Sequence, residues 1–412
     1  MLFGTTLNRT IFWELVKVFL LSLGSLTGLF LVAGLVQQAS QMGLSPAQVV
    51  AIIPLFVPST LPYTIPATTL FASCVVYGRL AQDNEVVAIK AAGVHLFTIL
   101  KPALLLGLLT SATTAGLYLT VIPQTQQQLQ AEILKDPEEV LYNALRRDRC
   151  LRHPTFPYVM YVRDVQGRRL VDVVLKRRVK VRDTRTGAEM WSGYDFVGRA
   201  REARLRVDVA EGVLYIDPDR FVVYDPKVQG TTASNGPFPV PLPDNLSAAD
   251  TRTRPMSLTW DDISPRADEL RADREKVYAA REAARQVSDA LPDGDMKTLT
   301  QQEERNYKSQ ADGMSRLIRN VEAELYMRPA LAFGCLVFAL MGCPVGIWAN
   351  RSDYLSTFVI CFLPTVFVYY PLLLAGSNMG KDGKLPLGLG CWLANIVVGL
   401  VGLSLTWRLL RR

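Results

Sequence analysis

Long runs of apolar residues lie near both ends of the chain, and nearly all charged residues lie between about 122 and 326. A helix needs about 20 apolar residues to cross a hydrocarbon core about 30 Å thick. Five windows meet this length: Ile11–Val36, Phe97–Ile122, Pro329–Ala349, Leu355–Gly376 and Leu387–Trp407. A sixth window, about Pro58–Tyr77, is equally apolar but contains prolines. The pattern predicts six membrane-spanning helices, three before and three after a polar region.

Two other interpretations of these windows are disfavoured. Buried helices of a soluble core would usually form shorter runs with a polar face, whereas no acidic residue lies in the middle of any window. A charge at that position would cost about 2.5–3.5 kcal/mol. The first window is also too long for a cleaved signal peptide, it contains Gly24 and Gly28, and no A-x-A site follows it. We therefore expect the first window to be a retained helix.

The distribution of Lys and Arg around the windows predicts the orientation. On one side of the membrane lie basic residues at Arg9, Lys17, Arg79, Lys90, Lys101, Arg351, Arg408, Arg411 and Arg412. The opposite loop Gln37–Gln48 carries no charge, and the loop Ser377–Pro386, with two lysines, is a mild exception. Both termini are thus expected in the cytoplasm and the large polar domain outside it. This bias also explains the formal charge of +7, so nucleic-acid binding is not indicated.

Prolines recur every four residues in the second span, at Pro54, Pro58, Pro62 and Pro66. Each proline lacks an N–H and leaves the carbonyl four residues earlier without its helical partner. In lipid this is tolerated only where protein or a watery cavity faces the helix. One interpretation is a broken, mobile helix that lines a substrate cavity, with Pro58, Pro62 and Pro66 at the gate. The other is a re-entrant or interfacial segment that ends at Pro58.

A short amphipathic helix is predicted between the second and third spans, within about 79–93. Asp83 or Asn84 can cap it, Glu85 lies in its first turn and Gly93 suits its end. Such a helix on the cytoplasmic side can dock a partner, or it can be a connector that lies on the membrane surface. The residues alone leave both interpretations open.

The polar region changes to a period of two, which is typical of strands. The predicted strands are Tyr158–Val165, Leu170–Val181, Tyr194–Arg199, Ala203–Val209, Val213–Ile216 and Arg220–Tyr224. Turn signals such as Asp217-Pro218 separate them. This spacing predicts an all-β domain at about 150–228, a sandwich or jelly roll. Leu205, Val207 and Val209 share one face, which forms either the domain core or a lipid-holding groove.

Helices are expected on both sides of this β domain. Gln124–Asp148 continues as a helix from the third span, and 229–260 is a linker rich in Gly, Pro, Ser and Asn. A charged helix over Ser264–Arg285 precedes a second one over Leu299–Tyr326, which leads directly into the fourth span. The predicted organisation is membrane spans in 1–122, a periplasmic domain in 123–326 with a helical extension at 261–326, and membrane spans in 327–412.

The chain lacks the sequence signatures of common catalytic and metal sites. It contains no G-x-x-x-x-G-K-[ST], HExxH or GxSxG motif, and its two histidines are His95 and His153. Cys150, as the single cysteine of the exported domain, has no partner there for a disulfide. No carboxylate within a span is available for a proton relay. We expect no catalytic residue, metal or cofactor, and neither nucleotide hydrolysis nor ion coupling by this chain itself.

Four stretches resemble one known family. They are Leu7–Glu14, Leu61–Pro66 followed by Gly78–Gly93, Glu324–Pro344 and Lys384–Ile396. The most specific of them reads Leu-Pro-Tyr-Thr-Ile-Pro, then Gly-Arg-Leu and Asp-Asn-Glu. Over nearly its whole length the chain resembles the LptF/LptG permeases of lipopolysaccharide export. Their three-plus-three topology around a strand-rich exported domain agrees with the pattern above.

The resemblance implies a mechanism in the bacterial inner membrane. Two permeases pair around a cavity above a cytoplasmic ABC ATPase dimer, and lipopolysaccharide enters from the outer leaflet between the first and fifth spans. The lipid then passes through the jelly rolls to a periplasmic bridge protein of similar domains. The segment 79–93 becomes the coupling helix, in which Glu85, Asp83 and Arg79 are expected to contact the ATPase.

Two departures and two alternatives remain. The outer half of the first span ends in Gln37-Gln38 where family members often carry basic residues, and the helices of about 261–326 are longer than usual. The resemblance leaves open whether the chain is F-like, G-like or self-pairing. One alternative is an exporter of another envelope lipid. The other is a non-transporting envelope scaffold, against which the coupling segment and the proline-rich span both weigh.

Overall fold

The computed structural model describes residues 6–42, 46–133, 136–152, 158–182, 189–208, 211–225, 230–234, 236–242, 255–292, 294–348, 356, 359 and 363–411. These residues divide into two compact units. The helical unit comprises Met1–Phe30, Val57–Thr125 and Pro255–Arg412, and the sheet unit comprises Leu31–Phe56 and Gln126–Arg254. Each unit is described separately below.

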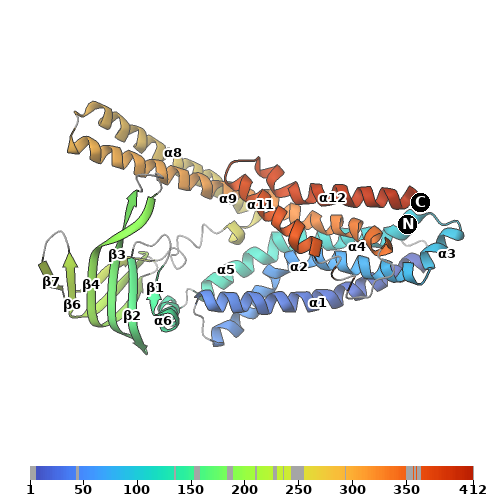
Figure 1. The fold of residues 1–412 in the computed structure, drawn as a ribbon, viewed down its shortest axis with the longest axis horizontal. Helices are drawn as coiled ribbons and strands as arrows, with labels where there is room; N and C mark the ends of the chain where they lie inside the picture. The colour runs from blue at the N-terminus through green and yellow to red at the C-terminus, as the bar shows by residue number, and fades with distance from the viewer. Residues whose placement is uncertain are drawn as a thin grey trace. The chain divides into compact units, whose positions relative to one another are not determined.

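Elongated helices that run side by side make up the helical unit (Figure 1). They are α1 (Thr6–Met42), α2 (Pro46–Gln82), α3 (Glu85–Ala91), α4 (Leu96–Gly116), η1 (Leu117–Val121), α5 (Ile122–Ile133), α8 (Trp260–Ala290), α9 (Asp295–Trp348), η4 (Thr365–Tyr369), α11 (Tyr370–Lys381) and α12 (Leu387–Arg411). Of these, α1, α2 and α5 continue into the sheet unit. Both termini and α3 lie at the same end of the helical unit (Figure 1).

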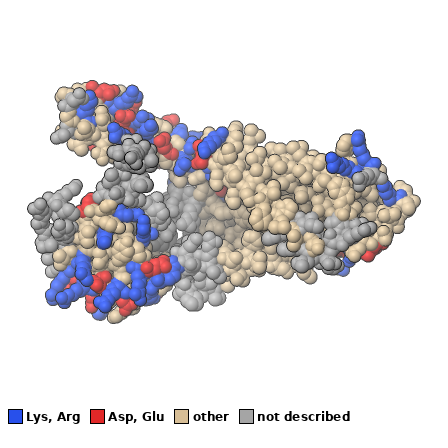
Figure 2. Space-filling model, in the orientation of Figure 1, with Lys and Arg blue, Asp and Glu red and all other residues tan. Residues whose placement is uncertain are grey.

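Four described helical segments are long and apolar enough to cross a membrane. They are Thr6–Leu35, Leu96–Leu129, Met296–Trp348 and Leu387–Arg411. They contain nearly all of the predicted windows Ile11–Val36, Phe97–Ile122, Pro329–Ala349 and Leu387–Trp407. The predicted window Leu355–Gly376 falls partly outside the described residues, and its described part continues through η4 and α11 to Lys381. Figure 2 shows the visible face of this bundle almost free of charged residues between its ends.

The proline-containing segment forms one continuous helix. Helix α2 runs from Pro46 to Gln82, so the predicted break is wrong, whereas the start of the span at Pro58 stays a prediction. Threonine hydroxyls of α2 also bond to backbone carbonyls of the preceding turn. Thr68 donates to the Thr64 carbonyl at 2.9 Å, and Thr69 donates to the Ile65 carbonyl at 2.8 Å. Neighbouring helices then enclose Pro62 and Pro66, which are buried.

Helix α9 packs closely against its neighbours through glycines. A Cβ at Gly342 would lie 2.6 Å from the Cβ of Ser73, and one at Gly346 would lie 2.6 Å from the Cys74 carbonyl oxygen. On α4, a Cβ at Gly107 would lie 2.7 Å from the Cβ of Ala339. Small residues permit such an approach, which drives helix association where lipid offers no hydrophobic effect.

The predicted charged helices form an antiparallel pair. Helix α8 extends the predicted segment at both ends, and α9 runs without interruption from Asp295 into the fourth predicted span. Ile263, Leu270, Ile318 and Val321 are buried between the two helices. This pair belongs to the helical unit rather than to the sheet unit with which the sequence grouped it, because α9 is continuous with its membrane half.

The sheet unit contains one antiparallel sheet of eight strands (Figure 1). The strands are β1 (Cys150–Leu151), β2 (Tyr158–Gln166), β3 (Arg169–Arg182), β4 (Glu189–Asp208), β5 (Val213–Asp219), β6 (Phe221–Asp225), β7 (Gly230–Ser234) and β8 (Phe238–Pro241). Their order is β1-β2-β3-β4-β5-β8, and β6 pairs with both β4 and β7. Helix α6 (Pro137–Asp148) begins after Asp136, whose carboxylate accepts a hydrogen bond from the Glu139 amide.

Three local predictions within this unit are corrected. The two strands expected at 194–209 are one long strand, β4, because β3 pairs with its first part and β5 with its second. The predicted turn at Asp217-Pro218 lies within β5. Part of the predicted linker forms β7 and β8, since these residues find partners in β6 and β5. The core beneath the sheet includes Leu170, Leu175, Leu214 and Ile216 together with residues of α6.

Candidate functional site

The segment predicted to dock a partner forms a short helix with two distinct sides. Val86 is buried against the helical bundle and Ile89 packs partly against it, whereas Glu85 and Val87 are exposed. Asn84 precedes the helix with φ of 58°, and Gly93 follows it with φ of 77°. The Gly93 amide donates to the Lys90 carbonyl at 3.1 Å, which ends the helix. Helix α3 is thus anchored by one side and presents the other.

An ion pair connects the start of this segment to the first helix. The guanidinium of Arg79 contacts the carboxylate of Glu14 on α1, and both side chains are partly exposed. Asp83 is exposed and its amide donates to the Arg79 carbonyl at 2.9 Å. Arg79, Asp83 and Glu85 therefore lie in consecutive turns at one end of the unit. Because Arg79 is paired with Glu14, it connects α2 to α1 and also contributes a positive charge to this end of the helical unit.

Polar contacts hold the proline-rich helix α2 to three neighbours. The hydroxyls of Thr27 on α1 and Thr64 are 3.1 Å apart, and Thr69 donates to Thr110 of α4 at 3.4 Å. The Tyr370 hydroxyl of α11 donates to the Tyr63 carbonyl. Pro58 is half-buried near the outer turns. These contacts connect α2 to α1, α4 and α11, of which α1 and α11 are predicted to line the gate.

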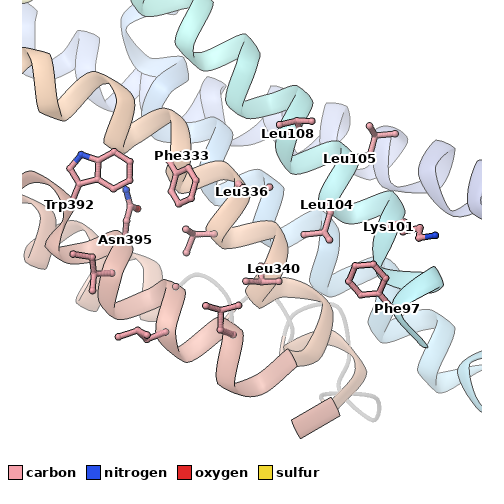
Figure 3. A pocket seen from close by; sticks show the side chains of 15 residues that line it. Phe97, Lys101, Leu104, Leu105, Leu108, Phe333, Leu336, Leu340, Trp392 and Asn395 are labelled. Atoms are coloured by element: carbon pink, nitrogen blue, oxygen red, sulfur yellow. The ribbon is translucent and has the colours of Figure 1, made fainter. Parts of the chain in front are cut away.

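A groove of about 880 Å³ lies elsewhere in the helical unit, between α4, α9 and α12. Figure 3 shows Phe97 and Lys101 of α4 at one end and Trp392 and Asn395 of α12 at the other. Nearly all of its fifteen lining side chains are apolar, with Lys101 as the charged exception. Pro58, Pro62 and Pro66 are not among the lining residues. The sequence did not predict this groove, although it shows that apolar residues recur on successive turns of α12.

The three residues proposed for a lipid-holding face have different surroundings. Leu205 is buried in the core, Val207 is half-buried and Val209 lies outside the described residues. Helix α6 covers this edge of β4: the Leu205 amide donates to the Tyr142 hydroxyl at 2.8 Å, and the Val207 amide to Glu138 at 3.3 Å. Tyr142 also donates to the Arg168 carbonyl at 2.8 Å. In this arrangement a lipid chain reaches Leu205 only if α6 moves.

Ion pairs across neighbouring strands stabilise the exposed side of the sheet. Arg177 binds Asp195 and Arg199 binds Asp172, each through two hydrogen bonds. The hydrogen bonds from Arg199 lower the pKa of Asp172, and those to Asp195 raise the pKa of Arg177. Burial raises the pKa of Tyr142. These groups remain in their usual charge states at neutral pH, and among the described residues no His, Cys, Asp and Glu cluster could hold a metal.

Long helices with apolar stretches of membrane-spanning length, joined in one chain to an antiparallel sheet domain, are typical of a multi-span membrane protein. The family model described as lipopolysaccharide export system permease LptF/LptG matches residues 9–408. The chain belongs to this family, whose members are inner-membrane transport subunits and not themselves enzymes. A search of curated proteins finds no match to the chain.

Proposed function

We propose that this chain is a permease subunit of an ABC-type complex that extracts lipopolysaccharide from the inner membrane and passes it to a periplasmic bridge. The observation that carries the proposal is α3, because it is anchored through Val86 and exposes Glu85 and Val87. A partner protein can pack against the exposed Val87 side chain and bind the neighbouring Glu85 carboxylate at the same time. Family membership supports the substrate.

The proposed topology has six spans and places both termini in the cytoplasm. The two spans beyond the four long apolar segments are α2 and the segment that ends in η4 and α11. Arg408 and Arg411 lie at the same end of the unit as α3 (Figure 1), which agrees with the excess of basic residues expected on the cytoplasmic side. The sheet unit, proposed as a jelly roll, would then lie in the periplasm.

In the proposed cycle an ATPase dimer binds α3 and moves α2. Glu85 and Asp83 contact the ATPase, and Arg79 transmits the movement to α1 through Glu14. The row of Pro58, Pro62 and Pro66 weakens the hydrogen bonding of α2 near the gate, since each proline removes one backbone donor. The contact between Tyr370 and Tyr63 would carry the same movement to α11. A second LptF/LptG-type permease completes the cavity.

Lipid transfer through the sheet unit would require α6 to leave the edge of β4. The face that carries Leu205, Val207 and Val209 would then be open to an acyl chain. The polar contacts that close it, from Tyr142 and Glu138 to backbone amides, can re-form with water when α6 moves. A photo-reactive residue at 207 should therefore capture lipid only while ATP is being hydrolysed. Equal capture without ATP would contradict a closed resting state.

The coupling assignment is tested by Glu85→Lys in the native cells. We expect normal membrane insertion, loss of the co-purified ATPase and loss of lipopolysaccharide at the outer membrane, because the reversed charge opposes the partner surface. Glu303→Lys, on the exposed side of α9, is the matched control and should support export. Normal export by Glu85→Lys would refute the coupling role. If a different envelope lipid were recovered with the wild-type complex, the proposed substrate would be wrong, but the proposed topology would be unaffected.

A further inference from the structure

The lining residues of the groove come from α4, α9 and α12, and none of them belongs to α1 or α11, the helices predicted to line the gate. Its floor includes Leu336 and Val337 of α9, and its rim is exposed: Leu108 is 58% exposed and Leu400 is 63% exposed. A Cβ at Gly399 would lie 3.8 Å from Val337, in ordinary contact, so a larger side chain could be placed at this position and would enter the groove. In a bilayer, water has no polar partners in such a groove, so hydrocarbon fills it.

The length of the groove matches one leaflet. Its lining residues run from Phe97 to Leu108 on α4 and from Trp392 to Leu403 on α12. Each stretch covers about 16 Å at 1.5 Å per residue, close to half of a hydrocarbon core about 30 Å thick. The groove therefore fits the acyl chains of a lipid from a single leaflet.

The one charged side chain among the lining residues lies at one end of the groove. Lys101 lies there beside Phe97 (Figure 3). On α12 the lining series 396, 400 and 403 continues along the same side to Trp407, and the Arg411 guanidinium lies 3.6 Å from the centre of the Trp407 ring. Tryptophan prefers the level of the lipid headgroups. This end thus combines a headgroup-level aromatic ring with two cations.

At the opposite end none of the lining residues is charged. Asn395 is buried and both functions of its amide are used: it donates to the Ala330 carbonyl at 2.6 Å and accepts from the Tyr369 hydroxyl at 3.1 Å. Trp392 packs against Phe333, with ring centroids 5.4 Å apart. A bound lipid would consequently place its headgroup at the Lys101 end and its chain ends beside Trp392.

We propose that this groove is a binding site for an anionic phospholipid of the cytoplasmic leaflet, with its phosphate between Lys101 and Arg411. The assignment of the leaflet rests on the orientation given under the proposed function. The lipid is distinct from the transported substrate, which would enter from the opposite leaflet between α1 and α11. A partner helix could also fill an apolar groove, but it would bring no phosphate to the two cations.

Native mass spectrometry of the full complex, delipidated and titrated with phosphatidylglycerol or phosphatidylcholine, tests the site. We expect preferential binding of phosphatidylglycerol, about fivefold weaker after Lys101→Ala or Arg411→Ala, because each surface cation adds roughly this factor. Lys17→Ala, which removes an exposed lysine from α1, is the matched control and should bind as the wild type does. Gly399→Phe should exclude both lipids by filling the groove.

The outcomes separate this site from the transport function. Equal binding of the two lipids, or unchanged binding after both charge removals, would overturn the headgroup site. Lipid retention by a correctly assembled Gly399→Phe complex would overturn the place of the acyl chains. A photo-reactive residue at Leu400 that captures a polypeptide instead of lipid would assign the groove to a partner helix. Each of these results leaves the outcome of Glu85→Lys, and hence the transport proposal, unaffected.

Discussion

Helix α9 passes through two different surroundings although its backbone is continuous from Asp295 to Trp348. Its first half, to about Leu325, carries acidic and basic residues and pairs with α8. Its second half, from Pro329, contains no Asp, Glu, Lys or Arg and packs among α2, α4 and α12. The same secondary structure is therefore stabilised by two different sets of contacts.

In the water-facing half, a narrow apolar seam is flanked by ion pairs. Ile318 and Val321 are buried against Ile263 of α8, while Glu304 pairs with Arg281 at 3.4 Å. Over the described residues of the membrane half there is no such apolar seam flanked by ion pairs, and α9 instead approaches α2 closely at Gly342 and Gly346. In water, burial of a few apolar side chains stabilises the helix pair through the hydrophobic effect. In lipid this effect is absent, so tight packing between the helices has to stabilise their contact.

The two halves meet at a buried ion pair. Arg328 is 3% exposed, and it binds Glu324 at 3.1 Å and the carbonyls of Pro255 and Leu258 at 3.0 Å. Its position one residue before Pro329 marks the change of surroundings. Because the guanidinium also satisfies the backbone of the segment before α8, it fixes the base of the helical pair.

The largest effect is expected at this junction. Arg328→Met should destabilise the chain by about 3–5 kcal/mol, since it leaves the half-buried Glu324 carboxylate and two backbone carbonyls without their donor. Thermal unfolding of the purified protein in detergent would measure the loss. Arg316→Met provides the control, because Arg316 forms an exposed pair with Asp382 at 3.1 Å and should contribute about 0.2–1 kcal/mol. Equal melting temperatures for the two variants would show that the Arg328 contacts contribute no more to stability than the exposed pair of Arg316.

Identical substitutions in the two halves should have opposite signs. Gly346→Ala places a methyl group against the Cys74 backbone and should cost about 1–3 kcal/mol. Gly313→Ala, in the water-facing half, meets nothing within 4 Å and should stabilise α9 by about 0.8–1.0 kcal/mol through helix propensity. The shift in melting temperature checks both. Stabilisation by Gly346→Ala would mean that α2 and α9 are not in tight contact.

The smallest effect concerns an exposed ion pair between α8 and α9. Glu322→Gln weakens the contact with Arg271 and should cost about 0.2–1 kcal/mol at low salt. Added salt should remove most of this difference, because it screens exposed charges. The effect of Gly346→Ala should persist at the same salt concentration. A salt-independent loss for Glu322→Gln would place the pair in a drier environment than its exposure indicates.

Local signals predicted many of the elements. Hydropathy identified the windows now seen in α1, α4, α9 and α12, and cap residues located α3. Alternation identified β2, β3, β5 and β6 within a few residues. These features depend on neighbours in sequence, so one sequence suffices to see them. The prolines were misleading, because the carbonyls and hydroxyls that support α2 include partners on other helices.

The candidate site was only partly visible. The family resemblance pointed to Asp83 and Glu85 as coupling residues, but the contact of Arg79 with Glu14 joins residues 65 positions apart. The cover of Leu205 by Tyr142 spans 63 positions. Neither of these two contacts can be derived from the hydrophobic periodicity of a helix or a strand. The groove requires three helices to come together, so it lies beyond any local pattern.

The sequence alone determined the class of the protein: apolar length, charge distribution and family motifs specify helices that cross a membrane around a strand-rich domain. Each residue's preference for lipid or water contributes to that result independently of the others. The tertiary structure decided the continuity of α2, the pairing of β4, the closed edge under α6 and the groove beside Lys101. Those features arise from contacts between distant segments, whose geometry depends on the packing of the whole unit.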